Sequence, residues 1–401
     1  MHNALQSALS RVGKVETHPG ILRIYRYDFL VIPKQLSRFV KTPICIVQPK
    51  SDEEVLKILE ISERFDVPII ARGMGTSGYG GCVPLEECII LDMKNLNKCS
   101  FQNNSVVVEA GAIWIDIEKS ANKLGKALRV YPTSANVATV GGWIAQNGYG
   151  VGSLKYGSIG ENVEWIEVAD YDGIKQIKGD KLKYYVGAFG TTGIILRACI
   201  KLRNAENIRS SAFECTFEET LNQIGSAYHA NFKDSYHMKF EKLGERDTLL
   251  VSYEEEGESS KLGKALWERR LSPLKALKKD KIYSEVVVPA DIALEFYDQA
   301  KKLAYGIEAI FARDCVVFLG LFGRSLKQYL RALKFVKIAE KLGGGIYATG
   351  LLFPHKNKAK KELEEYKRAV DPKNLLNPRK AFHNNSFSRI MKIGERLLWI
   401  T

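Results

Sequence analysis

A glycine-rich stretch at residues 68–81, PIIARGMGTSGYGG, constrains the fold of this chain more than any other feature. A short apolar run and Arg72 come first, and five glycines follow within positions 73–81. Glycine accepts φ > 0 and close approach of a ligand, and successive N–H groups in such a turn form an anion-binding nest. The Arg72 guanidinium adds a fork that matches a phosphate group. The stretch therefore predicts a loop that binds phosphate or pyrophosphate, although a glycine-rich surface loop without a ligand explains this stretch alone nearly as well.

The loop fits neither of two common phosphate-binding motifs. No Gly-Lys-Ser/Thr closes it, as a Walker A loop requires, and no GxGxxG opens a helix. Ser51 and Glu54 predict a capping box at the start of a preceding helix. Strands are expected at 43–48, 69–71, 88–92, 105–109, 165–169, 174–177 and 196–202, and helices at 51–65 and 115–124. This pattern predicts an α+β fold with a nucleotide-type site at a strand end.

Length and charge limit the classes of function. A chain of 401 residues is long enough for two or three domains, and 45% hydrophobic residues are ordinary for a globular protein. The net charge of +13 suits nucleic acid, an anionic membrane surface, or an acidic substrate and cofactor. The basic residues are scattered apart from runs such as 275–281 and 356–361, which are typical of solvated helix faces. Because no nucleic-acid-binding motif is present, no nucleic-acid partner is expected.

Cysteine usage and hydropathy predict a cytoplasmic protein. The seven cysteines include no CxxC pair, which argues against an iron–sulfur or zinc framework and favours free thiols in a reducing compartment. No signal peptide is evident, and the longest apolar run, 315–322, is too short to span a bilayer. Near the C-terminus, apolar residues recur at helical spacing over 387–399 with basic residues between them. This tail either packs on its own domain, docks on another subunit, or lies as a peripheral element at the inner face of a membrane.

Two further glycine-rich stretches follow at residues 131–160 and 185–195. Seven glycines in the first of them cost conformational entropy that a core does not require, which favours close approach of a ligand. Three such stretches in this order and spacing resemble the vanillyl-alcohol oxidase / p-cresol methylhydroxylase family of flavoproteins, over about residues 42–203. The resemblance implies a two-subdomain FAD-binding domain at residues 1–204, whose first loop holds the FAD pyrophosphate. The implied cofactor-binding residues are Arg72, Gly73, Met74, Gly75, Thr76, Ser77, Gly80, Gly81, Pro132, Thr139, Gly141, Gly142, Asn147, Gly150, Ser153, Tyr156, Gly157, Gly190, Thr191, Gly193, Ile194 and Ile195.

Two positions inside these motifs qualify the resemblance. Some members of the family attach FAD through a histidine at the position that Thr76 occupies here. A threonine cannot form that bond, so the FAD is expected to be held non-covalently. The family usually has Ser-Glu where this chain has Ala188-Phe189, which changes the hydrogen bonds on offer to the flavin or its neighbours and leaves the backbone loop intact.

The C-terminal half resembles the glycolate oxidase / D-lactate dehydrogenase branch of this family. Trp267 and Arg270 fit its Trp-x-x-Arg, and residues 371–378, DPKNLLNP, fit its terminal motif. The resemblance implies an α+β cap (substrate) domain at residues 205–370 and a segment at 371–401 that returns to the FAD domain. It also implies that Arg270 holds a substrate carboxylate, for which a guanidinium fork is the natural partner; a surface position in a basic helix is an equal alternative.

The metal-binding pattern of the branch is missing. The branch carries His-x-Gly-Asp-Gly-Asn-x-His and later Glu-His-Gly, whereas this chain has IFARDCVVFLGLF at 310–322 and GGGIYATGLLFPH at 343–355. No histidine pair with metal spacing remains, so no metal ion is expected. His355 is the first candidate for the base that takes the substrate proton and His237 is the second, although a lone histidine is more often structural.

Together these features predict an FAD-dependent oxidoreductase that oxidises a 2-hydroxy acid, of the D-lactate or glycolate type, by hydride transfer to flavin N5. Quinone, a dye, a carrier protein or oxygen would accept the electrons. The alternative is an FAD-bearing subunit, electron-transferring or non-catalytic, of a multi-subunit glycolate oxidase-like complex, in which the lost metal motif reflects a division of labour. A homodimer and a hetero-oligomeric complex both remain open.

Overall fold

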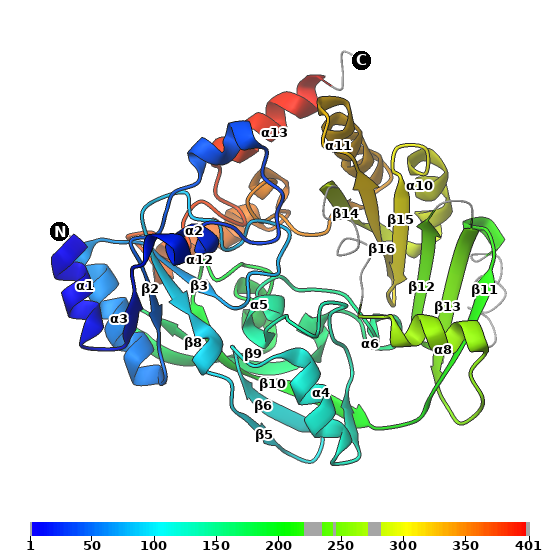
Figure 1. The fold of residues 1–401 in the computed structure, drawn as a ribbon, viewed down its shortest axis with the longest axis horizontal. Coiled ribbons are helices and arrows are strands. Elements are labelled where there is room, and N and C mark those ends of the chain that lie inside the picture. Colours follow the sequence, from blue (N-terminus) through cyan, green and yellow to red (C-terminus); the bar gives the residue numbers. More distant parts are fainter. Residues whose placement is uncertain (1, 220–234, 244–245, 272–281, 398–401) are drawn as a thin grey trace.

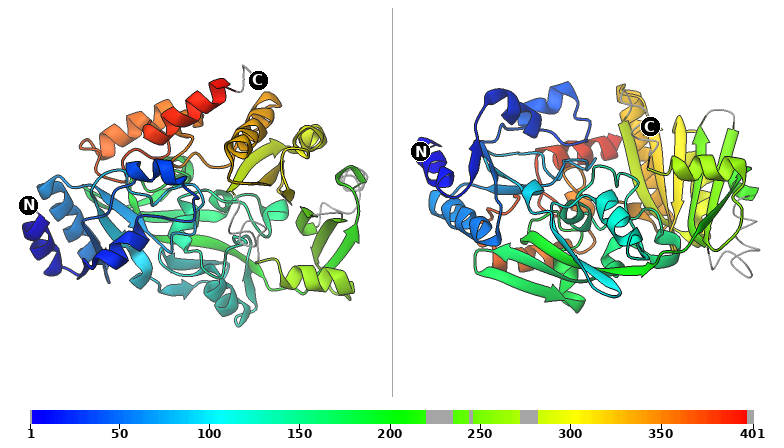
Figure 2. Two further views of the ribbon diagram at one scale, coloured as in Figure 1. Left: turned by 45° about the horizontal axis from the view of Figure 1, so that its top comes forward. Right: turned by 60° about the horizontal axis from the view of Figure 1, so that its bottom comes forward.

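The computed structural model describes residues 2–219, 235–243, 246–271 and 282–397. These residues form three β-sheets that follow one another along the chain, with helices packed on them (Figures 1 and 2). The predicted α+β fold is confirmed. The basic run at residues 275–281 and the last residues of the tail, 398–401, lie outside the described part of the chain.

The first sheet carries the glycine-rich loop at the end of one strand. Its order is β1-β2-β4-β3, and β2, β4 and β3 run parallel. The elements are β1 (Lys14–Glu16), β2 (Cys45–Gln48), β3 (Ile69–Arg72), β4 (Ile89–Asp92), α1 (His2–Ser10), α2 (Pro19–Tyr25) and α3 (Asp52–Phe65). α1 and α3 cover one face of the sheet and α2 covers the other. Because β3 ends at Arg72, residues 73–81 leave from the carboxyl end of a parallel strand, the edge where ligands bind in open α/β sheets.

At the start of α3, the structure contains one of the two hydrogen bonds of the predicted capping box. The Ser51 side chain accepts a hydrogen bond from the Glu54 N–H at 3.3 Å, as an N-cap does. The predicted capping box is wrong in its second half, because the Glu54 carboxylate accepts from the Lys50 N–H at 2.7 Å, one residue before the cap. α3 ends at Asp66, whose φ of 52° turns the chain towards β3.

The second sheet surrounds the other two glycine-rich stretches. Its order is β5-β6-β10-β8-β9, and β7 also pairs with β10. The elements are β5 (Cys99–Phe101), β6 (Ser105–Glu109), β7 (Lys126–Leu128), β8 (Val163–Asp170), β9 (Gly173–Lys178), β10 (Ile194–Asn204), α4 (Trp114–Asn122), α5 (Val140–Ile144) and α6 (Ser153–Tyr156). The predicted hairpin around residues 171–173 is confirmed by the β8–β9 pairing. Trp114 and Trp143 meet edge to face in the core beneath this sheet, with their ring centroids 5.1 Å apart.

The third sheet has seven strands in the order β11-β13-β12-β15-β16-β14-β17 (right in Figure 1). The elements are β11 (Ile208–Glu214), β12 (Ser235–Leu243), β13 (Arg246–Glu254), β14 (Ile282–Pro289), β15 (Gly306–Phe311), β16 (Cys315–Phe322), β17 (Gly345–Ile346), α8 (Lys261–Glu268), α10 (Ala293–Ala300) and α11 (Leu326–Lys341). Side chains alternate between the two faces of a strand. Val286 and Val288 of β14 accordingly pack in the core that α10 and α11 help to form, whereas Glu285 belongs to the opposite face. We call the third sheet the cap sheet. The face that carries Glu285 is turned towards the glycine-rich stretches, and we call it the inner face of the cap sheet.

The C-terminal segment returns to the first sheet. After α12 (Lys360–Val370), Leu376 bridges to Ile69 of β3, and the Asn377 N–H donates to the Ile69 carbonyl at 2.9 Å. α13 (Ser386–Leu397) then packs on α11, where Gly394 lies against Leu333 (Figures 1 and 2). Among the described helices, none is long and apolar enough to cross a membrane. The domain boundaries at 204/205 and 370/371 stay a proposal.

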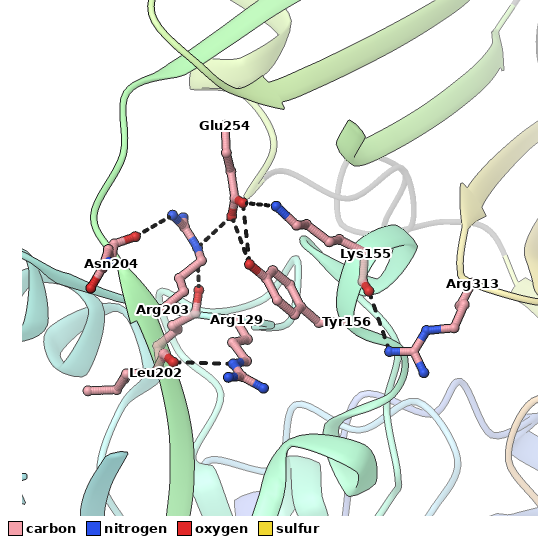
Figure 3. Close-up of polar contacts among 9 residues, drawn as sticks. Arg129, Lys155, Tyr156, Leu202, Arg203, Asn204, Glu254 and Arg313 are labelled. Carbon is pink, nitrogen blue, oxygen red and sulfur yellow. Dashed lines mark hydrogen bonds and ion pairs between the residues drawn. The ribbon is translucent and has the colours of Figure 1, made fainter. Parts of the chain in front are cut away.

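A buried carboxylate joins the second sheet to the third. Glu254, at the end of β13, lies between Arg203, Lys155 and Tyr156 (Figure 3). Its carboxylate is 3.0 Å from Arg203 Nε and 2.5 Å from Lys155 Nζ, and it accepts hydrogen bonds from Tyr156 Oη at 3.3 and 3.4 Å. Because the Glu254 side chain is only 4% exposed, this contact is desolvated and depends on all its partners.

Replacing Glu254 with Gln should lower the free energy of unfolding by about 2–3 kcal/mol, because the nearly buried Arg203 guanidinium loses its counter-charge. Urea unfolding followed by circular dichroism measures the change. Glu255→Gln is the matched control, because that neighbouring carboxylate is 48% exposed in its pair with Arg209 and should change stability little. Equal effects of the two substitutions would contradict the conclusion that Glu254 stabilises the contact between the second and third sheets.

Candidate functional site

A cavity lies between the glycine-rich stretches and the inner face of the cap sheet. One wall comes from the loop after β3 and from the two later stretches. The other wall comes from β14, β15 and β16, together with Tyr347. The residues that line the cavity include Arg72–Tyr79, Gly81, Pro132, Thr139, Gly141, Gly142, Tyr149, Phe189, Gly190, Gly193, Ile195, Glu285, Glu308, Ile310, Val317 and Tyr347. Residues from all three sheets therefore meet around one space.

The loop at residues 73–81 needs glycine at two positions for different reasons. Gly75 has φ of +65°, and a Cβ there would lie 2.2 Å from an Nη atom of Arg72, which passes beneath the loop. Gly78 lies against the cap sheet, and a Cβ there would lie 1.2 Å from Tyr283 Oη. Any side chain at either position would push the loop away from the groups that support it.

Arg72 supplies a positive charge to this wall of the cavity. Its guanidinium stacks over the Tyr25 ring at 4.8 Å, and its buried Nη1 has no hydrogen-bond partner among the described residues. A buried donor without a partner is costly, so a bound anion is the simplest way to satisfy it. Burial raises the pKa of the nearby Asp28 carboxyl to about 6, and the charge of Arg72 opposes that rise. The loop and Arg72 thus fit a pyrophosphate group.

The three glycine-rich stretches are tied to one another by close contacts and hydrogen bonds. A Cβ on Gly73 would lie 2.0 Å from Thr139 Oγ1, which brings the first stretch against the second. The Phe189 N–H donates to the Ala145 carbonyl at 2.8 Å and joins the second stretch to the third. Asn377 closes the set, because its side-chain amide donates to the carbonyls of Gly81 at 2.9 Å and Phe189 at 2.7 Å.

The structure divides the predicted cofactor-binding residues into two groups. Those that line the cavity are Arg72, Gly73, Met74, Gly75, Thr76, Ser77, Gly81, Pro132, Thr139, Gly141, Gly142, Gly190, Gly193 and Ile195. Outside this lining lie Gly80, Asn147, Gly150, Ser153, Tyr156, Gly157, Thr191 and Ile194. Several of the second group support the loops: Ser153 Oγ accepts from the Gly150 N–H, Asn147 Oδ1 accepts from the Gly160 N–H, and Thr191 Oγ1 donates to the Ala188 carbonyl.

Two of the three predicted catalytic residues, His355 and Arg270, lie away from the lining of this cavity. His355 Nε2 lies 3.3 Å from a carboxylate oxygen of Glu395 in α13, and His355 is not among the lining residues. Arg270 Nε donates to Tyr131 Oη at 2.9 Å, and its guanidinium stacks on Trp267, also away from the lining. His237 is on β12, and its side chain lies outside the described part of the structure. The catalytic roles of all three stay predictions.

Sequence reasoning missed two buried carboxylates that do line the cavity, Glu285 and Glu308. A signal was present, because each is the one charged residue within a mostly apolar strand, at 282–289 and 306–311. Burial, and secondly the charge of Glu308, raises the pKa of the Glu285 carboxyl to about 8. Within the described ranges, no three His, Cys, Asp or Glu residues are grouped as metal ligands would be.

Comparison with known proteins shows which cofactor the chain binds. Residues 43–176 match the family model described as the FAD binding domain. This chain contains an FAD-binding domain. The match confirms the cofactor that the glycine-rich stretches predicted, and the orphaned Arg72 Nη1 beside the glycine loop fits the pyrophosphate of FAD. Non-covalent attachment at Thr76 stays a prediction.

Named relatives extend the similarity beyond the FAD-binding domain. The chain is 28% identical to D-lactate dehydrogenase of Archaeoglobus fulgidus over 432 residues, a match that covers 89% of this chain and 95% of that protein. It is 30% identical to the glycolate oxidase subunit GlcD of Bacillus subtilis, over 45% of this chain and only 40% of that protein. A solved structure of alkyldihydroxyacetonephosphate synthase matches with a TM-score of 0.78 at 18% identity, covering 94% of this chain and 86% of that one, and shows a shared fold.

Replacing Gly75 with Ala should abolish most FAD binding, because the new Cβ would displace Arg72 in addition to straining the backbone. The ratio of flavin to protein absorbance in the purified chain measures the loss. Gly179→Ala is the matched control: Gly179 has nearly the same φ, +60°, but nothing lies within 4 Å of its Cβ position. If both variants keep full FAD content, the loop does not hold the cofactor as described.

Proposed function

We propose that this chain is an FAD-dependent oxidoreductase that oxidises a small 2-hydroxy acid of the D-lactate or glycolate type. The observation that carries the proposal is the single cavity with the FAD-binding stretches on one wall and the inner face of the cap sheet on the other. A substrate held against the second wall would face a cofactor held by the first. The names of the relatives, D-lactate dehydrogenase and glycolate oxidase subunit, support the substrate class.

Different residues of the chain would bind the cofactor and shield the reacting centre. The N–H groups of the loop at 73–77 and the Arg72 guanidinium would hold the pyrophosphate. Bound FAD would supply an acceptor for a hydride from the substrate carbon. Ile310 and Val317 give the cap side an apolar surface that excludes water from the reacting centre. A quinone, a dye or a carrier protein would then take the electrons onward.

A second function is favoured by one observation. His355 and Arg270, the residues predicted as base and carboxylate clamp, lie outside the cavity lining. The chain would then be the FAD-bearing subunit of a larger complex, in which a partner subunit completes the chemistry. The similarity to a protein named as a glycolate oxidase subunit agrees with this alternative.

Anaerobic mixing of the FAD-loaded chain with D- and L-lactate, glycolate and other 2-hydroxy acids separates the two functions. We expect at least one acid to bleach the flavin absorbance within a turnover, because substrate and cofactor share one cavity. The same acid without its hydroxyl group, such as propionate for lactate, is the control and should bleach nothing. No bleaching with any acid, together with co-purification of a second polypeptide, would instead favour the subunit function.

A further inference from the structure

The inner face of the cap sheet places two carboxylates in the FAD cavity. Glu285 of β14 and Glu308 of β15 are both paired with Leu319 of β16, one from each side. Residues directly opposite in antiparallel strands point to the same face, so the two side chains flank Leu319 on one surface. Both line the cavity, and their residues are only 7% and 3% exposed.

The two carboxylates differ in their surroundings. Glu308 Oε2 lies 3.1 Å from the Nζ of Lys239 on the neighbouring strand β12, and both side chains are at most 5% exposed. This ion pair offsets the desolvation of Glu308. For Glu285, burial is the main influence and the charge of Glu308 the second, and both raise the pKa of its carboxyl. Glu285 is therefore the carboxyl in the cavity that gains and loses a proton near neutral pH.

The opposite wall supplies an independent sign that a polar ligand binds here. Tyr79 lines the same cavity and is 8% exposed, and its buried hydroxyl has no hydrogen-bond partner among the described residues. The Tyr79 ring is 5.6 Å from that of Tyr347, whose hydroxyl accepts a hydrogen bond from the Tyr149 N–H. A buried hydroxyl without a partner is satisfied when a ligand brings a polar atom to it.

We propose that Glu285 is the group that accepts the proton of the substrate hydroxyl during oxidation in this cavity. The inference rests on the proposed function. The substrate O–H bond breaks and its proton passes to a Glu285 oxygen, while the O–H electron pair forms the C=O bond. The C–H bond breaks with its electron pair, which goes as a hydride to bound FAD as the two-electron oxidant. Glu285 ends as a neutral carboxylic acid and the substrate as a 2-oxo acid.

The pH dependence follows from the state of Glu285 in the folded chain. Its carboxyl is neutral below a pKa of about 8 and ionised above it, and only the ionised form can take a proton. The rate of flavin reduction should therefore rise as pH increases through about 8. If Glu285 instead donated a hydrogen bond to a substrate carboxylate, binding would weaken over the same range. The titratable groups near Glu285 on the packed elements are Lys239, Tyr283, Glu308, Tyr79, Tyr149 and Tyr347.

The first test is the Glu285→Gln variant of the full FAD-loaded chain. Gln keeps the size of the side chain but cannot accept the proton, so flavin reduction should slow by roughly 10²- to 10⁴-fold and lose its rise with pH. FAD content should match the wild type. The matched control is Glu118→Gln, which removes another buried carboxyl with a raised pKa that does not line the cavity, and it should leave the rate unchanged. A wild-type rate and pH profile in Glu285→Gln would overturn the proposal.

The second test needs no turnover and therefore separates this inference from the proposed function. The absorbance of oxidised FAD bound to the chain, recorded against pH, should shift with a midpoint near 8 as a charge forms beside the flavin. Glu285→Gln should lose this transition, and Glu308→Gln should move its midpoint to lower pH because a neighbouring negative charge is gone. If no hydroxy acid reduces the wild type but this transition behaves as expected, the substrate class fails while the assignment of Glu285 is supported. A transition that persists in Glu285→Gln, or none in the wild type, would overturn the assignment.

Discussion

Two hydrogen bonds from one buried side chain hold together the wall of the cavity that the glycine-rich stretches form. The Asn377 amide donates to the carbonyls of Gly81 and Phe189, which belong to stretches more than a hundred residues apart in the chain. The backbone of Asn377 also pairs with Ile69 in β3. The C-terminal segment thereby fixes the loop after β3 against the third glycine-rich stretch. Without this closure, the N–H groups of the loop would have no fixed position relative to the rest of the cavity.

The charges of the cavity are separated between its two walls. The wall formed by the glycine-rich stretches carries the Arg72 guanidinium next to its glycine loop, where it would meet the pyrophosphate of FAD bound as proposed. The cap wall carries Glu285 and Glu308, with Lys239 balancing the latter. At neutral pH this leaves the cap wall close to neutral overall, because Glu285 is largely protonated there. An anionic hydroxy acid can therefore approach the cap wall without meeting a net negative surface.

The wall of the cavity that the glycine-rich stretches form could be anticipated from the sequence because much of what it requires is local. Gly75 must adopt φ > 0 and leave room for Arg72, three residues earlier, and such a need shows directly as a glycine in the sequence. The cap wall depends on long-range register. Glu285 and Glu308 enter the cavity only because both strands pair with β16 at Leu319, which no local pattern reveals. His355 ends the stretch that stands in place of the branch's later metal-binding motif, yet its ring is turned to Glu395 of α13, a helix that is placed by tertiary packing.

The central claim is that one cavity holds FAD between the glycine loop and the carboxylate-bearing cap wall. A crystal structure of the chain with bound FAD tests it most directly. The account predicts the pyrophosphate within hydrogen-bond distance of the loop N–H groups and Arg72 Nη1, with the flavin ring between that wall and Glu285. A pyrophosphate away from the loop at 73–77, or a flavin ring that does not reach the strands β14 to β16, would contradict it.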